Sequence, residues 1–311
     1  MSEFHHVSVL LNECIDGLNI KPDGVYVDGT LGGAGHSSQI AARLTTGRLI
    51  GIDRDPVALA AAGERLKRWQ DRVTLVHSNF CEMASVLESL NIPGVDGILL
   101  DLGVSSPQLD DGQRGFSYMT DAPLDMRMNA QDALSAETVV NTWAQEELRR
   151  ILYAYGEERY APQIAAAICS KREQSPIKTT LELVDIIRGA MPPAALREKQ
   201  HPAKRSFQAI RIAVNDELGS VEKALQSAIP LLNPGGRLAI ITFHSLEDRI
   251  VKLAMNEAAK GCTCPPRLPV CVCGKKPKVK LINKKPIIAS DAELEENPRS
   301  RSAKLRICEK L

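Results

Sequence analysis

The sequence predicts an α/β protein in which a doubly wound parallel sheet is interrupted by an inserted helical domain. Over the first hundred residues, short apolar runs alternate with helical patterns, as in a parallel sheet that helices cover on both faces. From about residue 107 to residue 206 the helical patterns continue without a convincing strand. The alternation then resumes, and a chain of 311 residues is long enough for about two domains. We therefore expect one domain over residues 1–106 and 207–311, with the helical domain over residues 107–206.

The expected strands of the first half are short and mostly apolar, and helical patterns connect them. The strands cover residues 25–27, 48–52, 73–76 and 97–100. The helices cover residues 37–44, residues 56–69 and a segment that ends at Leu90. Asp55 is a favourable N-cap for the second of these helices, and Pro56 occupies its preferred first position.

The second half begins with the insertion and then returns to the sheet. Four helices are expected in the insertion, over residues 133–143, 146–155, 162–172 and 180–189. They are followed by a long helix over residues 207–232, a turn at 233–236 and a strand over 237–243. Residues 304–308 alternate between apolar and polar side chains, so we expect them to form a final edge strand.

The composition excludes several classes of protein. Hydrophobic residues make up 44% of the chain and charged residues 25%, as in ordinary globular proteins and unlike disordered or fibrous ones. No apolar run approaches the roughly 20 residues that span a bilayer. The first residues also lack the basic and apolar segments of a signal peptide. We therefore expect a cytoplasmic protein that does not associate with membranes.

The net charge of +1 hides an uneven distribution of charge. Residues 262–311 contain 12 Lys and Arg against 5 Asp and Glu, whereas the preceding residues contain 27 against 33. A second basic stretch lies between Arg197 and Arg211. Basic patches on a mildly acidic protein favour a polyanion such as nucleic acid as the partner, although lysine runs also serve solubility alone.

The eight cysteines fall into two groups. Four are scattered, the pattern of reduced, buried thiols in a cytosolic protein: Cys14, Cys81, Cys169 and Cys308. The other four cluster between prolines: Cys262, Cys264, Cys271 and Cys273. Four such thiols can form a tetrahedral zinc site, but the pairs are C-x-C rather than the C-x-x-C of most zinc knuckles. The alternative is a loop of oxidation-prone thiols, so we assign no metal from the sequence.

Several residues of types that bind ligands directly follow the expected strands. Ligands of open α/β sheets bind beyond the carboxyl ends of the strands. The positions there are Asp28, the glycine-rich residues 29–35, Asp53, Phe80, Asp101 and His244. The glycines allow a close backbone approach and present N–H groups at a helix N-terminus, and an acid after the second strand suits two ribose hydroxyls. The pattern predicts a cofactor that contains a nucleoside.

Two cofactors remain open at this point. The G-x-G-x-x-G fingerprint of dinucleotide binding is absent, and the carboxylate of Asp28 would repel a pyrophosphate. The same carboxylate would attract the sulfonium and ammonium groups of S-adenosylmethionine, which we therefore favour. An NAD-dependent oxidoreductase is one alternative. A non-catalytic RNA-binding module with a vestigial cofactor fold is another.

Eight motifs together resemble the bacterial 16S ribosomal RNA cytosine-N4-methyltransferases, the RsmH or MraW family. The motifs cover residues 28–36, 52–56, 96–110, 114–117, 124–128, 155–159, 207–211 and 243–249. The resemblance extends from His6 to about Arg306. It implies a class I S-adenosylmethionine-dependent methyltransferase fold with a helical insertion. It also implies methyl transfer to the exocyclic N4 amine of a cytidine in the decoding region of 16S rRNA, in the small ribosomal subunit. Whether the protein is a monomer or a homodimer stays open.

The resemblance also implies roles for individual residues. Ala34, Gly35 and His36 would contact the methionine end of the cofactor, and Asp53 would hold the ribose hydroxyls. Phe80 would flank the adenine, while Asp101 and Gln108 would complete the pocket near the reacting end. His36 could instead simply begin a helix and Phe80 could belong to the core, and Gln108 rests on the resemblance alone.

Asp101 is our candidate catalytic residue. It would orient either the target amine or the ammonium group of the cofactor. Many amino-methyltransferases carry two prolines and an aromatic residue after this acid, whereas this chain continues Leu-Gly-Val. The contacts to the target amine are therefore open, and the secondary candidates are Ser105, Ser106 and His244. The candidates for RNA contact are the basic C-terminal segment and Arg197, Lys199, Lys204 and Arg205.

Overall fold

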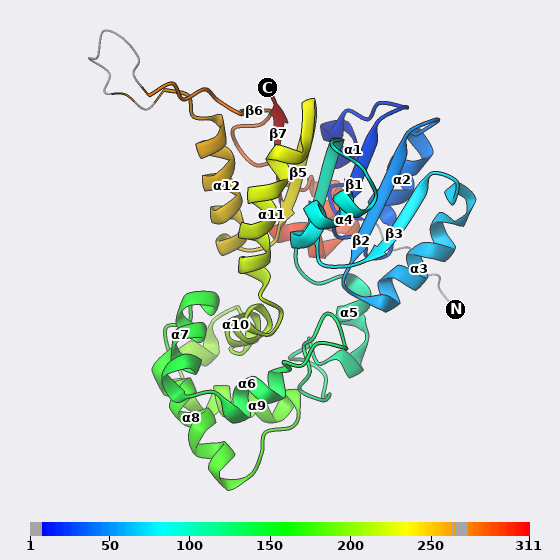
Figure 1. Cartoon of the computed structure of the whole chain (residues 1–311). Coiled ribbons are helices and arrows are strands. Elements are labelled where there is room, and N and C mark those ends of the chain that lie inside the picture. The colour runs from blue at the N-terminus through cyan, green and yellow to red at the C-terminus, as the bar shows by residue number, and fades with distance from the viewer. Residues whose placement is uncertain (1–7, 263, 265–272) are drawn as a thin grey trace. The chain divides into compact units, whose positions relative to one another are not determined.

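A computed structural model describes residues 8–262, 264 and 273–311 (Figure 1). The chain forms two compact units, which are described separately. The first comprises Met1–Gly103 and Leu218–Leu311, and the second comprises Val104–Glu217. The first unit thus resumes eleven residues later than the domain boundary we predicted at residue 207.

The first unit is built on a seven-stranded sheet with the order β3-β2-β1-β4-β5-β7-β6. Its strands are β1 (Val25–Asp28), β2 (Arg48–Asp53), β3 (Val73–His77), β4 (Val95–Asp101), β5 (Leu232–Thr242), β6 (Val279–Leu281) and β7 (Lys304–Lys310). Strands β1 to β5 pair in parallel, and β7 is antiparallel to both β5 and β6. The strand order reverses between β1 and β4, and such a switch point is where open α/β sheets bind their ligands.

Helices cover both faces of this sheet, as the sequence predicts. One apolar cluster joins the sheet to α4 (Met83–Ser89), α11 (Glu217–Leu231) and α12 (Ser245–Ala259). Another joins its opposite face to α1 (Leu11–Leu18), α2 (Gly35–Arg43) and α3 (Pro56–Leu66). The short helices η1 (Lys67–Trp69), η2 (Phe80–Glu82), α13 (Asp291–Glu296) and η5 (Pro298–Ser302) complete the unit. Consecutive strand residues such as Leu49 and Ile50 enter different clusters because side chains alternate along a strand.

The cap predicted for α3 is confirmed. The Asp55 carboxylate accepts a hydrogen bond from the Val57 N–H at 3.0 Å, and Pro56 is the first helical residue. The predicted turn at residues 233–236 instead lies within β5. It shifts the pairing register between β4 and β5, since Val95 pairs with Leu232 whereas Gly97 pairs with Arg237.

The second unit is helical. Its helices are α5 (Ser106–Asp110), η3 (Gly112–Arg114), α6 (Ala136–Thr142), α7 (Gln145–Gly156), α8 (Ala161–Gln174), α9 (Thr180–Ala190), η4 (Ala195–Arg197) and α10 (Lys204–Asn215). Helices α6 to α10 share one apolar core. The four predicted helices of the insertion correspond to α6 to α9. Among its described residues this unit has one isolated β-bridge, Pro123 to Thr179, and no strand. Gly156 at the end of α7 approaches the backbone of α10 closely, since a Cβ there would lie 2.7 Å from the Arg205 carbonyl oxygen.

Two predicted elements are wrong in detail. The long helix over residues 207–232 is two helices, because Asp216 adopts a left-handed conformation (φ 46°) that ends α10 before α11 begins. Residues 304–308 do not form an edge strand, because β7 lies between β5 and β6. The true edge is β6, and three residues in a lysine-rich segment are too short a pattern to predict a strand.

Two of the four scattered cysteines are buried as predicted, Cys14 and Cys308, while Cys81 and Cys169 are half-buried. Burial raises the pKa of the Cys308 thiol to about 12. Among the described residues, every helix is either too short or too polar to be a candidate membrane span.

Candidate active site

Three carboxylates and an aromatic ring lie at the carboxyl edge of the sheet. Asp28, Asp53 and Asp101 are the last residues of β1, β2 and β4, and Phe80 follows β3. Because β1 and β4 are neighbours at the switch point, this edge brings together residues that are far apart in the sequence.

The glycine-rich loop between β1 and α2 is fixed across three strand ends. The Gly29 N–H donates to the Leu99 carbonyl oxygen of β4 at 2.9 Å, and the Leu31 N–H donates to the Ile52 carbonyl oxygen of β2 at 3.1 Å. A Cβ on Gly29 would lie 2.9 Å from the Phe80 Cβ, so only glycine allows the loop to pass beside Phe80. A Cβ on Gly33, by contrast, would meet no atom within 4 Å. The loop backbone at Gly33 is therefore accessible to a ligand.

Asp53 is held rigidly by this loop. Its Oδ2 accepts a hydrogen bond from the Gly32 N–H at 2.7 Å, and its Oδ1 accepts one from the Asp55 N–H at 2.8 Å. Burial raises the pKa of Asp53, and these N–H groups oppose the rise. The Arg54 N–H also hydrogen-bonds this carboxylate. A carboxylate has about four lone-pair sites, so Asp53 can still accept a hydrogen bond from a ligand in a fixed geometry.

Helix α2 begins at this edge of the sheet. Its N-cap, Ala34, is buried and left-handed (φ 57°), and a Cβ on Gly35 would lie 1.8 Å from the Ser8 Oγ. His36 is buried as well, and its Nε2 lies 3.0 Å from the Val9 carbonyl oxygen. Because a carbonyl can only accept, Nε2 carries the hydrogen. The other ring nitrogen, Nδ1, lies 3.9 Å from the Asp101 Oδ2.

Asp101 and Asp28 are linked through Thr30. The Asp101 N–H donates to the Thr30 Oγ1 at 2.6 Å, and the Thr30 N–H donates to the Asp28 Oδ1 at 3.2 Å. The Ser37 hydroxyl donates to the other oxygen of Asp28 at 2.7 Å. Two buried carboxyl groups are thus held close together at the switch point.

Asp101 is the most perturbed of these acids. Its Oδ1 is buried and has no hydrogen-bond partner in the part of the chain that the structure describes, although 26% of the whole side chain is exposed. Burial, together with the carboxylates of Asp28 and Glu247, raises the pKa of Asp101 to about 8. Burial also raises the pKa of Asp28 to about 6. A cationic ligand beside these two acids would stabilise their charged form. Asp28 and Asp101 therefore fit the ammonium and sulfonium groups of S-adenosylmethionine.

The perturbed pKa of Asp101 predicts a pH-dependent stability. The folded pKa of about 8 exceeds the unfolded value of about 3.9, so the stability that the protonated carboxyl contributes is complete below about pH 3.9 and is lost as the pH rises through about 8. Asp101→Asn removes this titration. We expect the urea unfolding midpoint of this variant, relative to that of the wild type, to increase between about pH 5 and pH 8 when both are measured without ligand. The exposed Asp71→Asn is the control, and parallel pH profiles for wild type and Asp101→Asn would contradict the assignment.

The structure brings six of the seven predicted cofactor residues to one edge of the first unit: Ala34, Gly35, His36, Asp53, Phe80 and Asp101. Gln108 belongs to α5 of the second unit, where it is buried and its Oε1 accepts from the Ser105 N–H at 3.0 Å. His244 caps α12 and forms a capping box with Glu247, so it has a structural role. The sequence reasoning missed Thr30, Ser37 and Glu247. For Glu247 a signal existed, since the acid three residues after His244 is typical of a capping box.

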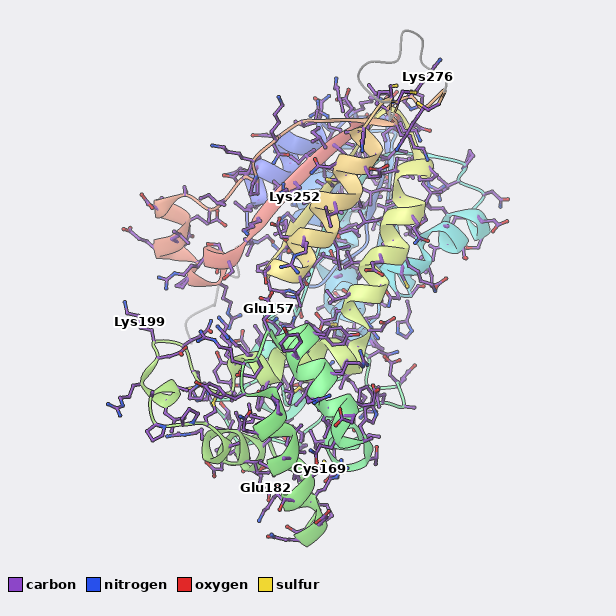
Figure 2. All side chains as sticks on the ribbon, turned by 90° about the vertical axis from the view of Figure 1, so that its left-hand side faces the viewer. Glu157, Cys169, Glu182, Lys199, Lys252 and Lys276 are labelled. Atoms are coloured by element: carbon purple, nitrogen blue, oxygen red, sulfur yellow. The ribbon has the colours of Figure 1, made fainter. Side chains whose placement is uncertain are left out.

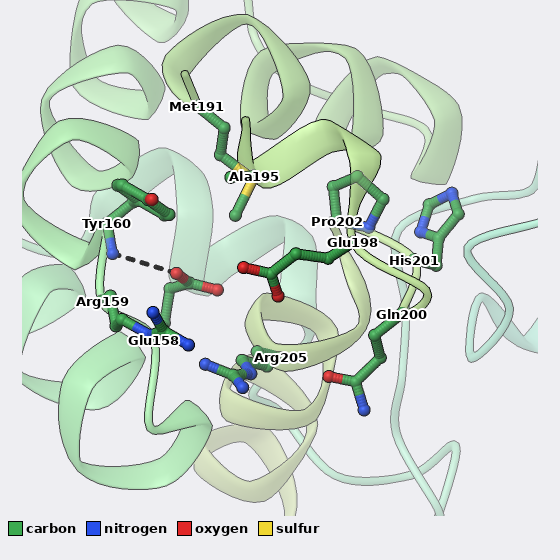
Figure 3. A pocket seen from close by; sticks show the side chains of 10 residues that line it. All are labelled: Glu158, Arg159, Tyr160, Met191, Ala195, Glu198, Gln200, His201, Pro202 and Arg205. Atoms are coloured by element: carbon green, nitrogen blue, oxygen red, sulfur yellow. Dashed lines mark hydrogen bonds between the residues drawn. The ribbon is translucent and has the colours of Figure 1, made fainter. Parts of the chain in front are cut away.

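A pocket in the second unit contains part of the predicted RNA-contact stretch. Its lining residues are Glu158, Arg159, Tyr160, Met191, Ala195, Glu198, Gln200, His201, Pro202 and Arg205 (Figure 3). Glu158 is buried, its Oε1 accepts from the Tyr160 N–H at 2.9 Å, and its Oε2 has no hydrogen-bond partner among the described residues. The His201 ring stacks on Tyr118, with 4.6 Å between the ring centroids. The pocket thus combines guanidinium groups, a buried carboxyl group and an aromatic stack.

Three further basic residues lie exposed beside this pocket: Arg197, Lys199 and Lys204. The Lys199 side chain projects from the edge of the unit (Figure 2). In the C-terminal segment, Lys275 pairs with Glu257 and Lys280 pairs with Glu309, so part of the charge there is neutralised locally.

Comparisons with known proteins agree with this architecture. The family model described as the MraW methylase family matches residues 3–311. Two proteins named ribosomal RNA small subunit methyltransferase H are similar over nearly their whole length. The protein from Brevibacillus brevis is 58% identical over 309 residues, 99% of this chain and 98% of that one. The protein from Clostridium botulinum strain Kyoto is 59% identical over 310 residues, 99% of this chain and 100% of that one.

Among solved structures, an rRNA methylase from Streptococcus thermophilus aligns with 10% identity and a TM-score of 0.42, over 97% of this chain and 93% of that one. The sheet order, in which β1 to β5 are parallel and β7 runs antiparallel between β5 and β6, is that of the doubly wound α/β sheet that the sequence predicts. The predicted fold class is thereby confirmed. The chain is a member of the MraW methylase family.

Proposed function

We propose that this protein transfers a methyl group from S-adenosylmethionine to the exocyclic N4 amine of a cytidine in the decoding region of 16S rRNA. The main support for S-adenosylmethionine as the methyl donor is the pair of buried acids at the switch point, Asp28 and Asp101. The acceptor is supported by the names of the relatives and, for the cytidine N4, by the motifs around Asp101.

Each predicted residue has a role in binding the cofactor. Asp53 accepts hydrogen bonds from the ribose hydroxyls, and Phe80 flanks the adenine. The start of α2, at Ala34, Gly35 and His36, contacts the methionine end. Gln108 is assigned to the reacting end of the cofactor on the family resemblance alone.

Asp101 acts at the reacting end. The exocyclic amine of cytosine is a weak nucleophile because its lone pair is delocalised into the ring. The cofactor supplies an already activated methyl group, so the protein's main task is to align nitrogen, methyl carbon and sulfur at about 3 to 3.5 Å. The Asp101 carboxylate accepts a hydrogen bond from the amine or from the cofactor's ammonium group and so fixes this alignment.

The RNA contact lies on the second unit. The target base must leave its stack to reach the site, and the contacts that hold the surrounding strand are electrostatic. Arg197, Lys199, Lys204 and the pocket around Arg205 provide such contacts, with the basic C-terminal segment as a second surface.

The binding of the small ribosomal subunit tests this surface. Replacing Arg197, Lys199 and Lys204 by Gln is expected to weaken binding and to reduce the slope of log K against log salt by about 0.7 for each phosphate that is no longer neutralised. The matched control replaces the exposed basic residues Arg48, Lys67 and Lys252 of the first unit by Gln, which changes the net charge equally. Filter binding at several salt concentrations measures the effect. Equally weakened binding by the two triple variants would contradict the assignment.

The reaction itself is tested on unmodified small ribosomal subunits. The protein is incubated with these subunits and isotopically labelled S-adenosylmethionine, and the nucleosides are analysed by mass spectrometry. Labelled N4-methylcytidine is the expected product. Cofactor binding without labelled product would refute the proposed substrate, and the absence of cofactor binding would refute the assignment of the site.

A further inference from the structure

Three cysteine sulfur atoms converge in the segment that follows α12. The Sγ atoms of Cys262, Cys264 and Cys273 all lie within 4.8 Å of one another. The distance between the Sγ atoms of Cys262 and Cys273 is 3.7 Å. A disulfide bond would require about 2.05 Å, so these two sulfurs are close without being bonded.

The spacing matches the edge of a zinc tetrahedron. With a Zn–S bond of about 2.3 Å, two thiolates of a tetrahedral site are about 3.8 Å apart. In addition, the Cys264 N–H points to the Cys262 Sγ at 3.4 Å, an arrangement that orients and stabilises a thiolate ligand.

The fold brings the two ends of this segment together. The Lys278 N–H donates to the Ala258 carbonyl oxygen at 2.8 Å, which joins the start of β6 to the last turn of α12. A Cβ on Gly261 would lie 3.5 Å from the Pro277 Cδ, so the two arms remain adjacent beyond that bond. Cys262 and Cys273 continue these two arms, and their approach is therefore a consequence of the sheet and α12.

The cluster lies away from the candidate active site within the same unit. Helix α12 begins beside the carboxyl end of β5 and has 15 residues, so its last turn is about 22 Å along its axis from the Asp101 edge. The strand register agrees. Val279 pairs with Lys310, next to the Glu309 that pairs with Arg237, five residues before the carboxyl end of β5. An ion held there would not reach the reacting atoms.

We propose that Cys262, Cys264 and Cys273 bind one zinc ion as thiolates and that this ion fixes the connection between α12 and β6. The three thiols release their protons to solvent when the ion binds. Cys271 lies outside the described residues and is not part of the proposal. The site has a structural role and does not depend on the proposed methyl transfer.

Metal analysis of the full-length protein tests the site. Protein purified under reducing conditions without chelator is expected to contain one zinc per chain, released when a mercurial reagent modifies the thiols. The stripped protein, titrated with Co²⁺ alone, is expected to show thiolate-to-cobalt charge transfer and the visible bands of tetrahedral cobalt. Absence of both signals in the wild-type protein would overturn the proposal.

Variants identify the ligands. Cys262→Ser, Cys264→Ser and Cys273→Ser are each expected to lower Zn²⁺ affinity at least about tenfold, whereas Cys81→Ser and Cys169→Ser should leave it unchanged. Full zinc binding by the triple serine variant would overturn the proposal. Because a serine variant could also misfold, circular dichroism and S-adenosylhomocysteine binding are measured on each. A folded variant that has lost zinc but still binds this ligand supports a structural site apart from the cofactor pocket.

Discussion

Replacing Asp101 by Asn is expected to slow methyl transfer at least about 100-fold without unfolding the protein. The amide keeps the shape of the carboxyl group but not its charge, and small losses of alignment between reacting atoms cost about this much in rate. The buried Oδ1 of Asp101 has no hydrogen-bond partner among the described residues, so the substitution breaks no side-chain hydrogen bond there. Single-turnover kinetics with unmodified small ribosomal subunits measure the effect.

The same variant distinguishes between the two alternative roles of Asp101. If its carboxylate holds the cofactor's ammonium group, the dissociation constant of S-adenosylhomocysteine rises as the rate falls. If it holds the target amine, the rate falls while that dissociation constant is unchanged. Asp71→Asn, at an exposed carboxylate, is the matched control and should retain full activity. A wild-type rate for Asp101→Asn would exclude Asp101 from the reaction.

Replacing Asp53 by Ala is expected to raise the dissociation constant of S-adenosylhomocysteine about 100-fold. The carboxylate is fixed by the N–H groups of Gly32 and Asp55, and each hydrogen bond between a charged group and a ligand is worth about 1.5–3 kcal/mol. The substitution removes both ribose contacts and leaves two loop N–H groups without their acceptor. Isothermal titration calorimetry measures the change, with Asp71→Ala as the control. An affinity within threefold of the wild type would place the ribose elsewhere.

The positions of the strands and of their terminal acids could be predicted from the sequence because both depend on local patterns. Apolar runs that end in Asp28, Asp53 and Asp101 define the edge of a parallel sheet, and Asp55 followed by Pro56 defines a helix start. The partners of these acids could not be predicted in this way. Thr30 joins Asp101 to Asp28 only because β1 and β4 are neighbours, which is a property of the topology.

The errors have similar causes. The break between α10 and α11 falls at Asp216, which is neither glycine nor proline. Aspartate can adopt the left-handed backbone that ends α10, but its presence in a sequence does not predict that conformation. The interior position of β7 depends on β6, whose three residues form no recognisable pattern. The convergence of Cys262 and Cys273 depends on pairing between α12 and the start of β6, which sequence spacing alone does not encode.

The insertion of the second unit between β4 and β5 has a consequence for synthesis on the ribosome. The 114 residues of Val104–Glu217 must be translated after β4 and before the first residue of β5. At roughly 5–20 residues per second this takes about 6 to 23 s. During that interval the nascent β3-β2-β1-β4 sheet presents the β4 edge, later covered by β5, as an unpaired strand. Such an edge can pair with other chains, so the nascent protein is most exposed to misassembly, and to chaperone capture, while the helical unit is being made.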